Sequence, residues 1–393
     1  MLFHSRLEDH YSDLAHHYSR SANTEKAVEY LHLAGQQAVQ RSANAEAITH
    51  LTAALELLKN LPATPERDQQ ELILQLLLGV PLMAIKGWAA PEVERAYVRA
   101  RELCEQLGET RQLFSVLRGL WECYEAQGKL VVSRELGEQL FSLAESMADP
   151  ALLLVAHDVL ADSLYWDGQF VAARTHTEQG TALYDRQQHH VLASLYGGYD
   201  PGVACLGIEA LSLWALGYPA RSSKKLADTL TLAHELSHPY SLAYAQFIAT
   251  WLFQNRREGQ AVLEYAEAVI SLSIAQEFPF WVAWATIPQG WALARQGEQK
   301  EGLACLHQGL ALYRAVGGEV SQSYFLALLA ETYGEMGQIE EGLAVVAEAL
   351  VGVHRTEEHF WEAELYRIKG ELLLAQEDLG LQAEGLREKT EEA

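Results

Sequence analysis

A turn glycine that ends one apolar helical pattern and precedes the next recurs about every 40 residues along this chain. These glycines are Gly128, Gly168, Gly217, Gly297 and Gly337. On both sides of each glycine, apolar residues are spaced three and four positions apart, which is the period of an amphipathic α-helix. A helix, a tight turn and a second helix repeated at a fixed period predict an elongated array, because one helix pair cannot bury its own apolar face.

Two irregular intervals interrupt this period. The interval between Gly217 and Gly297 is about twice as long as the others, so it accommodates one further repeat with Arg257 at the glycine position. The interval before Gly217 is lengthened by the loop 197–202, which contains three glycines and Pro201. We expect this loop to separate two sub-arrays and to form a bend or joint between them.

Small and large residues alternate at fixed offsets within each repeat, so that the two helices of a pair can approach closely. One repeat provides Ala330, Tyr333, Gly337, Gly342, Val346 and Ala349, and the preceding repeat provides Gly290, Leu293, Gly297, Gly302, Leu306 and Gly309. This order is typical of tetratricopeptide repeats. No segment shows the alternation of a β-strand. We therefore predict an all-α fold, a tetratricopeptide-like α-solenoid in which antiparallel helix pairs form a right-handed superhelix.

The same patterns predict the division of the chain. We expect N-terminal tetratricopeptide-like helices at 1–62, a first repeat sub-array at 63–196, the irregular loop at 197–202, a second sub-array at 203–376 and a disordered acidic tail at 377–393. The length of 393 residues agrees with an array, because a single hydrophobic core stops growing at roughly 250–300 residues.

Charge and composition narrow the class of partner. The chain has 53 acidic and 29 basic residues and a formal net charge of −24, so it repels phosphate backbones and anionic membrane surfaces. We therefore expect neither a nucleic-acid partner nor a membrane partner. No apolar stretch reaches the length of a membrane span, and the N-terminus does not resemble a signal peptide. The 4 cysteines form no C-x-x-C pair, which favours a reducing, cytoplasmic location.

Several stretches are similar to one protein family. They are Leu7–Tyr18, Lys26–Gly35, Thr64–Arg67, Gly87–Val93, Tyr199–Cys205 and Ala363–Leu373. From residue 7 to residue 376, the chain resembles the C-terminal tetratricopeptide sensor region of bacterial STAND, or AAA-type, signalling ATPases. In that family, a nucleotide-cyclase or kinase-like domain precedes the ATPase, and the repeats follow.

This resemblance implies a regulatory or sensor module that is not an enzyme. The catalytic domains of the family lie outside this region, and the sequence contains no G-x-x-x-x-G-K-[ST] phosphate loop. The resemblance implies a protein partner, namely an ATPase or cyclase module in the same chain or in another chain. It also implies an inducer, either a small molecule or a protein, and it requires no cofactor.

Aromatic residues recur at the positions of each first helix that face the concave surface of a tetratricopeptide array. The candidate ligand or partner groove comprises Trp166, Trp214, Tyr244, Phe247, Trp251, Trp284, Trp291, Arg295 and Tyr324. Equivalent positions in the first half are more polar and hold Arg118, Glu122, Glu125, Asp158, Asp162 and Tyr165. Exposed aromatic residues are typical of binding surfaces, which makes a small-molecule sensor the alternative function. The competing interpretation is that these rings pack between helices as core.

One short motif indicates a remote third function. His234-Glu235-Leu236-Ser237-His238 matches the H-E-x-x-H pattern of zinc hydrolases, in which two histidines on one helical face bind the metal. Pro239 follows directly, so His238 lies at a helix end. The preferred interpretation is a solvated helix terminus, and we expect neither a metal site nor catalytic residues. His10, His16 and His17 are expected to be surface residues.

Overall fold

The computed structural model describes residues 7–195 and 198–391, and every regular element in these ranges is a helix. The first part contains η2 (Glu8–His10), α1 (Tyr11–Ser19), α2 (Thr24–Gln40), α3 (Asn44–Leu58), α4 (Pro65–Lys86), α5 (Pro91–Leu107), α6 (Thr110–Ala126), α7 (Leu130–Met147), α8 (Pro150–Trp166), α9 (Phe170–Leu183), α10 (Arg186–His189) and α11 (Leu192–Leu195). The second part contains α12 (Pro201–Ala215), α13 (Pro219–Leu236), α14 (Pro239–Asn255), α15 (Gly259–Ala275), α16 (Pro279–Arg295), α17 (Gln299–Ala315), α18 (Gln322–Glu335), α19 (Ile339–Thr356) and α20 (Glu362–Glu391). None of the described helices combines the length and the apolar character needed to cross a bilayer.

The turns between paired helices have the backbone conformation that the sequence predicts. The five turn glycines all have positive φ, from +69° at Gly128 to +99° at Gly297. Arg257 takes the same left-handed conformation, with φ +61°, at the position predicted for the degenerate repeat. Glycine is the residue that adopts this conformation without a steric penalty, which explains why it marks most repeats. The predicted solenoid of helix pairs is confirmed.

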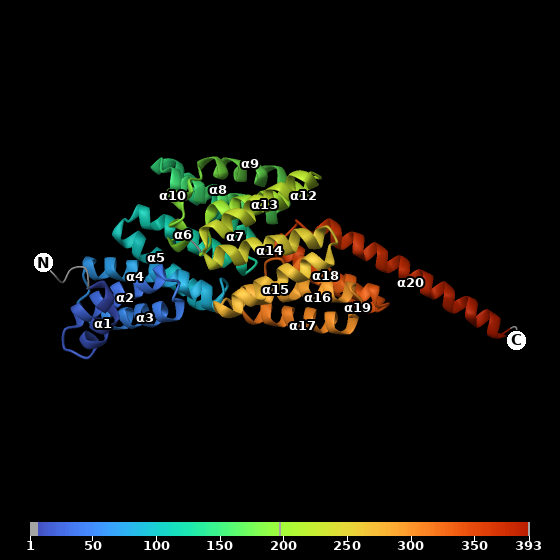
Figure 1. Cartoon of the computed structure of the whole chain (residues 1–393), viewed down its shortest axis with the longest axis horizontal. Coiled ribbons are helices and arrows are strands. Elements are labelled where there is room, and N and C mark those ends of the chain that lie inside the picture. The colour runs from blue at the N-terminus through green and yellow to red at the C-terminus, as the bar shows by residue number, and fades with distance from the viewer. Residues whose placement is uncertain (1–6, 196–197, 392–393) are drawn as a thin grey trace.

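The helices form an inner and an outer layer. The inner helix α14 is buried on almost all sides, from Tyr240 to Gln254. Its outer partner α15 buries a single stripe of Val262, Ala266 and Val269 at helical spacing. The inner helices α6, α8, α14, α16 and α18 carry most of the large aromatic side chains of the core. Figure 1 shows how the array curves, which directs these inner helices toward a shared interior.

The last repeats contact the ends of inner helices from the first half. The loop 316–321, between α17 and α18, reaches the end of α6, where the Glu319 N–H donates to the Ala126 carbonyl over 2.8 Å. The loop 357–361, between α19 and α20, reaches the end of α8. There the N–H groups of His359 and Phe360 donate to the Trp166 carbonyl over 3.0 and 3.1 Å. We call these three hydrogen bonds the closing seam, because they close the superhelix around its interior.

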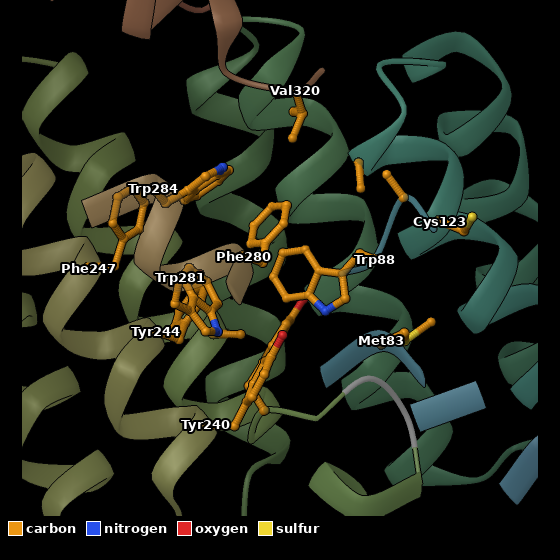
Figure 2. Packing of buried hydrophobic residues seen from close by; sticks show 14 of the residues in the cluster. Met83, Trp88, Cys123, Tyr240, Tyr244, Phe247, Phe280, Trp281, Trp284 and Val320 are labelled. Carbon is orange, nitrogen blue, oxygen red and sulfur yellow. The ribbon is translucent and has the colours of Figure 1, made fainter. Parts of the chain in front are cut away.

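A second contact between the two halves comes from the loop 87–90, which joins α4 and α5. The Trp88 ring lies 4.5 Å from the Phe280 ring and 5.2 Å from the Trp281 ring, measured between centroids. Figure 2 shows these rings turned toward one another. Gly87 has φ +90°, and a Cβ atom there would lie 3.3 Å from the Val316 Cβ. The interior is therefore enclosed on this side as well.

The loop 197–202 is anchored where the structure describes it. Residue 197 lies outside the described residues. The buried Asp200 side chain accepts from the Gly202 N–H over 2.9 Å, which caps the start of α12, and from the Tyr184 hydroxyl over 3.0 Å. The Asp200 N–H donates to the Ser241 hydroxyl on α14 over 2.9 Å. This part of the loop is thus tied to both neighbouring repeats, and the division into two sub-arrays stays a prediction.

The acidic tail forms the last part of α20. We predict disorder over 377–393, but α20 continues as a helix to Glu391 and extends away from the body (Figure 1). The segment is rich in Glu and Leu, which have high helix propensity, although it also contains Gly380 and Gly385. The predicted disorder of the tail stays a prediction, and residues 392–393 lie outside the described residues.

The pairing of α16 with α17 depends on glycines that allow backbone contact, which leads to a stability prediction. A Cβ atom on Gly302 would lie 2.5 Å from both the Ala294 nitrogen and the Gly290 carbonyl oxygen. Gly302→Ala should therefore destabilise the protein by about 1–3 kcal/mol, because backbone cannot move as a flexible side chain does. Urea unfolding at neutral pH measures the change.

Gly352, in α19, provides the matched control. It is helical, and a Cβ atom there would meet nothing within 4 Å. Gly352→Ala should stabilise the protein by about 0.5–1 kcal/mol through helix propensity. Equal effects of the two substitutions would contradict the backbone contact between α16 and α17.

Candidate functional site

The inner helices α6 and α8 place a cluster of charged side chains in the interior. Arg118, Glu122 and Glu125 follow one another at helical spacing on α6. Asp158 and Asp162 do the same on α8. Residues three or four positions apart lie on the same face of a helix, so each helix presents its set to the other. The result is four carboxyl groups and one guanidinium in a largely buried region.

The Arg118 guanidinium forms hydrogen bonds with two partners. It is 1% exposed, and its Nη1 donates to the Glu122 carboxylate, which is 2% exposed. Its Nη2 donates to the Tyr199 hydroxyl over 3.1 Å, and its guanidinium lies 4.4 Å from the centroid of the Trp121 ring. A buried ion pair tolerates its loss of hydration only because such partners surround it.

Glu125 and Asp162 lie beside each other and beside the Trp166 indole, which opposes the effect of burial on the pKa of both carboxyls, but one oxygen of each carboxyl is unpaired. Among the described residues, the Glu125 Oε2 and Asp162 Oδ1 atoms are buried without a hydrogen bond. Burial raises the pKa of the Glu125 carboxyl well above its ordinary value, and the charges of Asp162 and Glu122 raise it further. Burial likewise raises the pKa of Asp162 to about 7, with Glu122 adding to the shift and Arg118 opposing it. Both carboxyls therefore hold protons at pH values where an exposed carboxyl is ionised.

Aromatic rings enclose this pair of carboxyls. The residues that line the small interior cavity with Glu122, Glu125 and Asp162 include Trp88, Trp166, Tyr199, Tyr244, Phe247, Trp251, Trp281 and Trp284. Figure 2 shows Tyr244, Phe247, Trp281 and Trp284 gathered on one side of this region, opposite Trp88. About 20 Å³ of the cavity is accessible to the centre of a water molecule. This volume suffices for roughly one water molecule, so any larger ligand requires the interior to open.

Several indole donors around the cavity are unpaired. Among the described residues, the Nε1 atoms of Trp88, Trp166, Trp251, Trp281 and Trp284 are buried and make no well-aligned hydrogen bond. The neighbouring acceptors are the Tyr240 hydroxyl for Trp88 and Trp281, the Tyr313 hydroxyl for Trp284, and the Glu125 and Asp162 carboxyls for Trp166. Buried polar atoms in folded proteins nearly always have a partner, so a cluster of exceptions indicates a site. The interior combines unpaired donors on its rings with unpaired acceptors on Glu125 and Asp162.

The predicted groove residues fall into three places. Trp166, Tyr244, Phe247, Trp251 and Trp284 line the interior cavity. Tyr324 is buried and stacks on Trp251 at 4.9 Å between centroids. The rings thus face inward as the repeat frame predicts, but they fill the interior instead of lining an open groove. Their role in binding stays a prediction.

The other three predicted groove residues lie elsewhere. Trp291 is fully buried and donates from its Nε1 to the Glu331 carboxylate over 2.8 Å. Arg295 is exposed, lies 5.4 Å from the centroid of the Trp291 ring and pairs with Glu335. Trp214 is partly exposed in a separate surface cleft that also contains Phe360 and Trp361. These side chains are not part of the interior site.

Sequence reasoning missed Trp88, Tyr199 and Trp281. Trp88 lies in the loop between α4 and α5, and Tyr199 lies just before α12. Counting back from the turn glycines identifies positions on helices only, so it does not find residues that loops contribute. A usable signal was present, since both aromatic residues lie within three residues before a proline that begins a helix, namely Pro91 and Pro201.

The H-E-x-x-H match is divided between two helices. α13 ends at Leu236, Ser237 has φ +52°, and His238 caps the start of α14 by accepting from the Ser241 N–H. Glu235 pairs with Arg186 over 2.6 Å. The two histidines therefore do not share one helical face, and the motif gives no support to zinc chemistry. Over residues 7–195 and 198–391, no group of three potential metal ligands comes together.

Comparison with known proteins supports the fold. No protein-family model matches the chain. The uncharacterized protein R02095 of Rhizobium meliloti (strain 1021) is 25% identical over 358 residues, which cover 91% of this chain but only 34% of that protein. This chain thus corresponds to about a third of the relative's length.

Similar solved structures are helical repeat proteins. The Rap protein complexed with competence and sporulation factor superposes with a TM-score of 0.57 at 11% identity, covering 88% of this chain and 99% of that one. The Rap conjugation gene regulator of plasmid pLS20, in complex with the Phr* peptide, gives 0.52 at 11% identity over 91% and 97%. The APC/C Cut9–Hcn1 complex gives 0.53 at 14% identity over 94% and 59%. The fold is a tetratricopeptide-like α-solenoid. At these identities, the likeness extends to the fold alone.

The buried state of Asp162 leads to a prediction about pH. Its pKa is raised from 3.8 to about 7, so the folded state binds a proton that the unfolded state releases at lower pH. This contribution to stability is complete at acidic pH and is lost as the pH rises toward 7. The wild-type free energy of unfolding should therefore fall by roughly 2 kcal/mol between pH 5 and pH 8 through this group.

Asp162→Asn should remove that loss, because an amide does not titrate. Urea unfolding of both proteins at pH 5, 6, 7 and 8 measures the difference. We expect the variant to gain stability relative to the wild type as the pH rises. Parallel pH profiles of the two proteins would contradict a raised pKa at Asp162.

Proposed function

We propose that this chain is a non-catalytic regulatory and protein-interaction module whose closed interior receives a ligand. The observation that carries the proposal is the interior cavity itself, where Glu125, Asp162 and several indoles remain unpaired. Leaving buried polar atoms unpaired costs free energy, so a core serving stability alone would contain apolar residues there. A ligand that pairs with these groups accounts for their presence.

The surrounding protein supports a sensor role. The chain corresponds to about a third of its Rhizobium relative, which suits a module that works beside other domains. Its resemblance to the repeat region of bacterial STAND ATPases favours an ATPase domain and a nucleotide-cyclase or kinase-like domain as these other domains. The partner we propose is an ATPase or cyclase module, in the same chain or in another, whose activity the repeat module controls.

The structural neighbours support a protein or peptide as the ligand. Two of the similar solenoids are complexes, one with competence and sporulation factor and one with the Phr* peptide. A small-molecule inducer is the second candidate, and the enclosed, aromatic-lined interior favours it specifically, because such cavities bury most of a small ligand's surface.

Opening of the closing seam is the conformational change that we expect a ligand to control. The cavity has room for about one water molecule, so a ligand enters only when the loops 316–321 and 357–361 separate from α6 and α8. Four main-chain hydrogen bonds hold this contact, because the Val320 N–H also donates to the Ala126 carbonyl over 3.4 Å, and each is worth about 1 kcal/mol net. The Phe360 ring adds packing on Trp166 at 5.0 Å between centroids. An open state within a few kcal/mol of the closed state is what a ligand-controlled equilibrium requires.

Hydrogen exchange tests this opening. The amides of Glu319, His359 and Phe360 should exchange faster than the Gly302 amide, which donates within the tightly packed start of α17. A peptide and metabolite fraction from the host cytosol should change the exchange of the three seam amides while leaving Gly302 unchanged. Equal protection at all four positions, unaffected by the fraction, would contradict the proposal.

Co-purification and matched tryptophan variants test the ligand and the partner. The tagged module should retain a peptide or metabolite from the same fraction, and it should retain an ATPase or cyclase from whole lysate. Trp251→Phe should reduce ligand retention at least tenfold, because Trp251 lines the cavity. Trp291→Phe is the control, since Trp291 is equally buried but lies outside the cavity. Equal losses in both variants would indicate a general effect on folding.

A further inference from the structure

We propose that the closed interior binds an organic cation, an alkylammonium or a guanidinium group, between the Glu125 and Asp162 carboxylates and the surrounding indole rings. This inference rests on the proposed function, because it names the chemistry of the ligand that the interior receives. It is carried by three features of the cavity: its charge, its aromatic walls and its unpaired atoms.

The charge of the cavity favours a cation. The described groups that act electrostatically on the Glu125–Asp162 pair include Arg118, Glu122, Asp158, Tyr165, Tyr199, Cys205, Tyr244 and Tyr313. Arg118 is the single cationic side chain in this set, and it is already bound to Glu122 and Tyr199. An anionic ligand would meet four carboxyl groups, whereas a cation would supply the missing counter-charge.

The unpaired atoms show that the carboxyl pair is not simply a solvated acidic patch. Glu125 is 6% exposed and lines the cavity, and its Oε2 atom has no hydrogen-bond partner among the described residues. The same holds for the Asp162 Oδ1 atom. One water molecule can donate to these oxygens, but it cannot balance their negative charge when the carboxyls are ionised. An ammonium or guanidinium group carries both the charge and several donors.

The aromatic walls suit the apolar part and the charge of such a ligand. The rings of Trp166 and Trp251 lie 5.7 Å apart between centroids, and Trp251 stacks on Tyr324. The faces of electron-rich rings attract organic cations, most strongly where water is excluded. A hydrated metal ion gains little from such walls. The unpaired Trp166 and Trp251 N–H groups would in turn pair with acceptor oxygens elsewhere on the ligand, such as peptide carbonyls.

Trp166 connects the cation site to the closing seam. Its indole lines the cavity, while its own carbonyl oxygen accepts from the His359 and Phe360 N–H groups. Ala126, whose carbonyl accepts from Glu319, directly follows Glu125 and also lines the cavity. A ligand that shifts either residue therefore acts directly on the hydrogen bonds that keep the superhelix closed.

The test compares peptides that differ in one charge. Two pools of random pentapeptides are incubated with the protein, one with arginine fixed at the central position and one with citrulline, its neutral isostere, at that position. Mass spectrometry of the peptides that co-elute with the protein measures retention. We expect the arginine pool to be retained at least tenfold better. Agmatine and spermidine, tested by calorimetry, show whether a free amine is sufficient.

The pH dependence provides an independent readout. A cation binds the ionised carboxylates, and Asp162 takes up a proton near pH 7 in the unliganded protein. Affinity for the cationic ligand should therefore rise about tenfold from pH 6 to pH 8, with proton release on binding. Calorimetry of the retained peptide or amine in two buffers with different ionisation heats measures the released protons.

Two variants separate the site from general electrostatics. Asp162→Asn should fold at least as stably as the wild type, and it should reduce the preference for arginine over citrulline at least fivefold. Glu209→Gln is the control. Glu209 is a buried carboxyl on α12 that pairs with Lys225 over 2.8 Å, and it lies outside both the cavity lining and the closing seam. Its substitution should leave the preference unchanged.

The outcomes distinguish this inference from the function on which it rests. Preference for arginine that depends on Asp162 supports a cationic peptide. Binding of agmatine or spermidine with the expected pH dependence, without peptide retention, supports a free amine. Equal retention of both pools overturns the cation site while leaving peptide binding intact. If neither pool nor amine binds, the cation site is overturned, and the seam exchange and co-purification experiments decide the proposed function separately.

Discussion

The hydrogen bonds between the last repeats and the ends of α6 and α8 determine what kind of solenoid this is. A tetratricopeptide array stabilises itself through neighbouring repeats, so its two ends need not meet. Here the Glu319 N–H reaches the Ala126 carbonyl, and the His359 and Phe360 N–H groups reach the Trp166 carbonyl. Contacts between distant repeats make the array a closed body with an interior. Every unusual property of the inner helices follows from that closure.

Closure explains why the charged side chains of α6 and α8 are costly to bury. In an open groove, Glu122, Glu125, Asp158 and Asp162 would be solvated like other acidic residues of this chain. Inside the closed superhelix they share Arg118 and a cavity that holds about one water molecule. Burial removes the water that would stabilise a charged carboxylate, so the neutral, protonated form is favoured. Burial therefore raises the pKa of Glu125, Asp158 and Asp162. The stability of the closed state and the protonation of its interior are therefore coupled.

The sequence predicts local geometry better than it predicts this long-range contact. Helical periodicity and the positive-φ turns at Gly128 and Gly337 are local properties, so the repeat frame could be derived directly. The frame also identified Glu125 and Trp251 as inward-facing, because helix position determines direction. Whether the array closes depends on curvature summed over many repeats. No local pattern encodes that sum, so an open groove was expected where the rings instead fill a closed interior.

The long helix α20 begins two residues after Phe360, whose N–H is part of the seam. It contains 30 residues, so it is about 45 Å long at 1.5 Å per residue. Its first part packs on α18 and α19, where Leu365, Ile368 and Leu372 are buried, so α20 follows any rotation of these last repeats. A helix of this length magnifies such a rotation, and a tilt of about 5° displaces its far end by about 4 Å relative to its start. Figure 1 shows the later part of the helix extending beyond the other repeats.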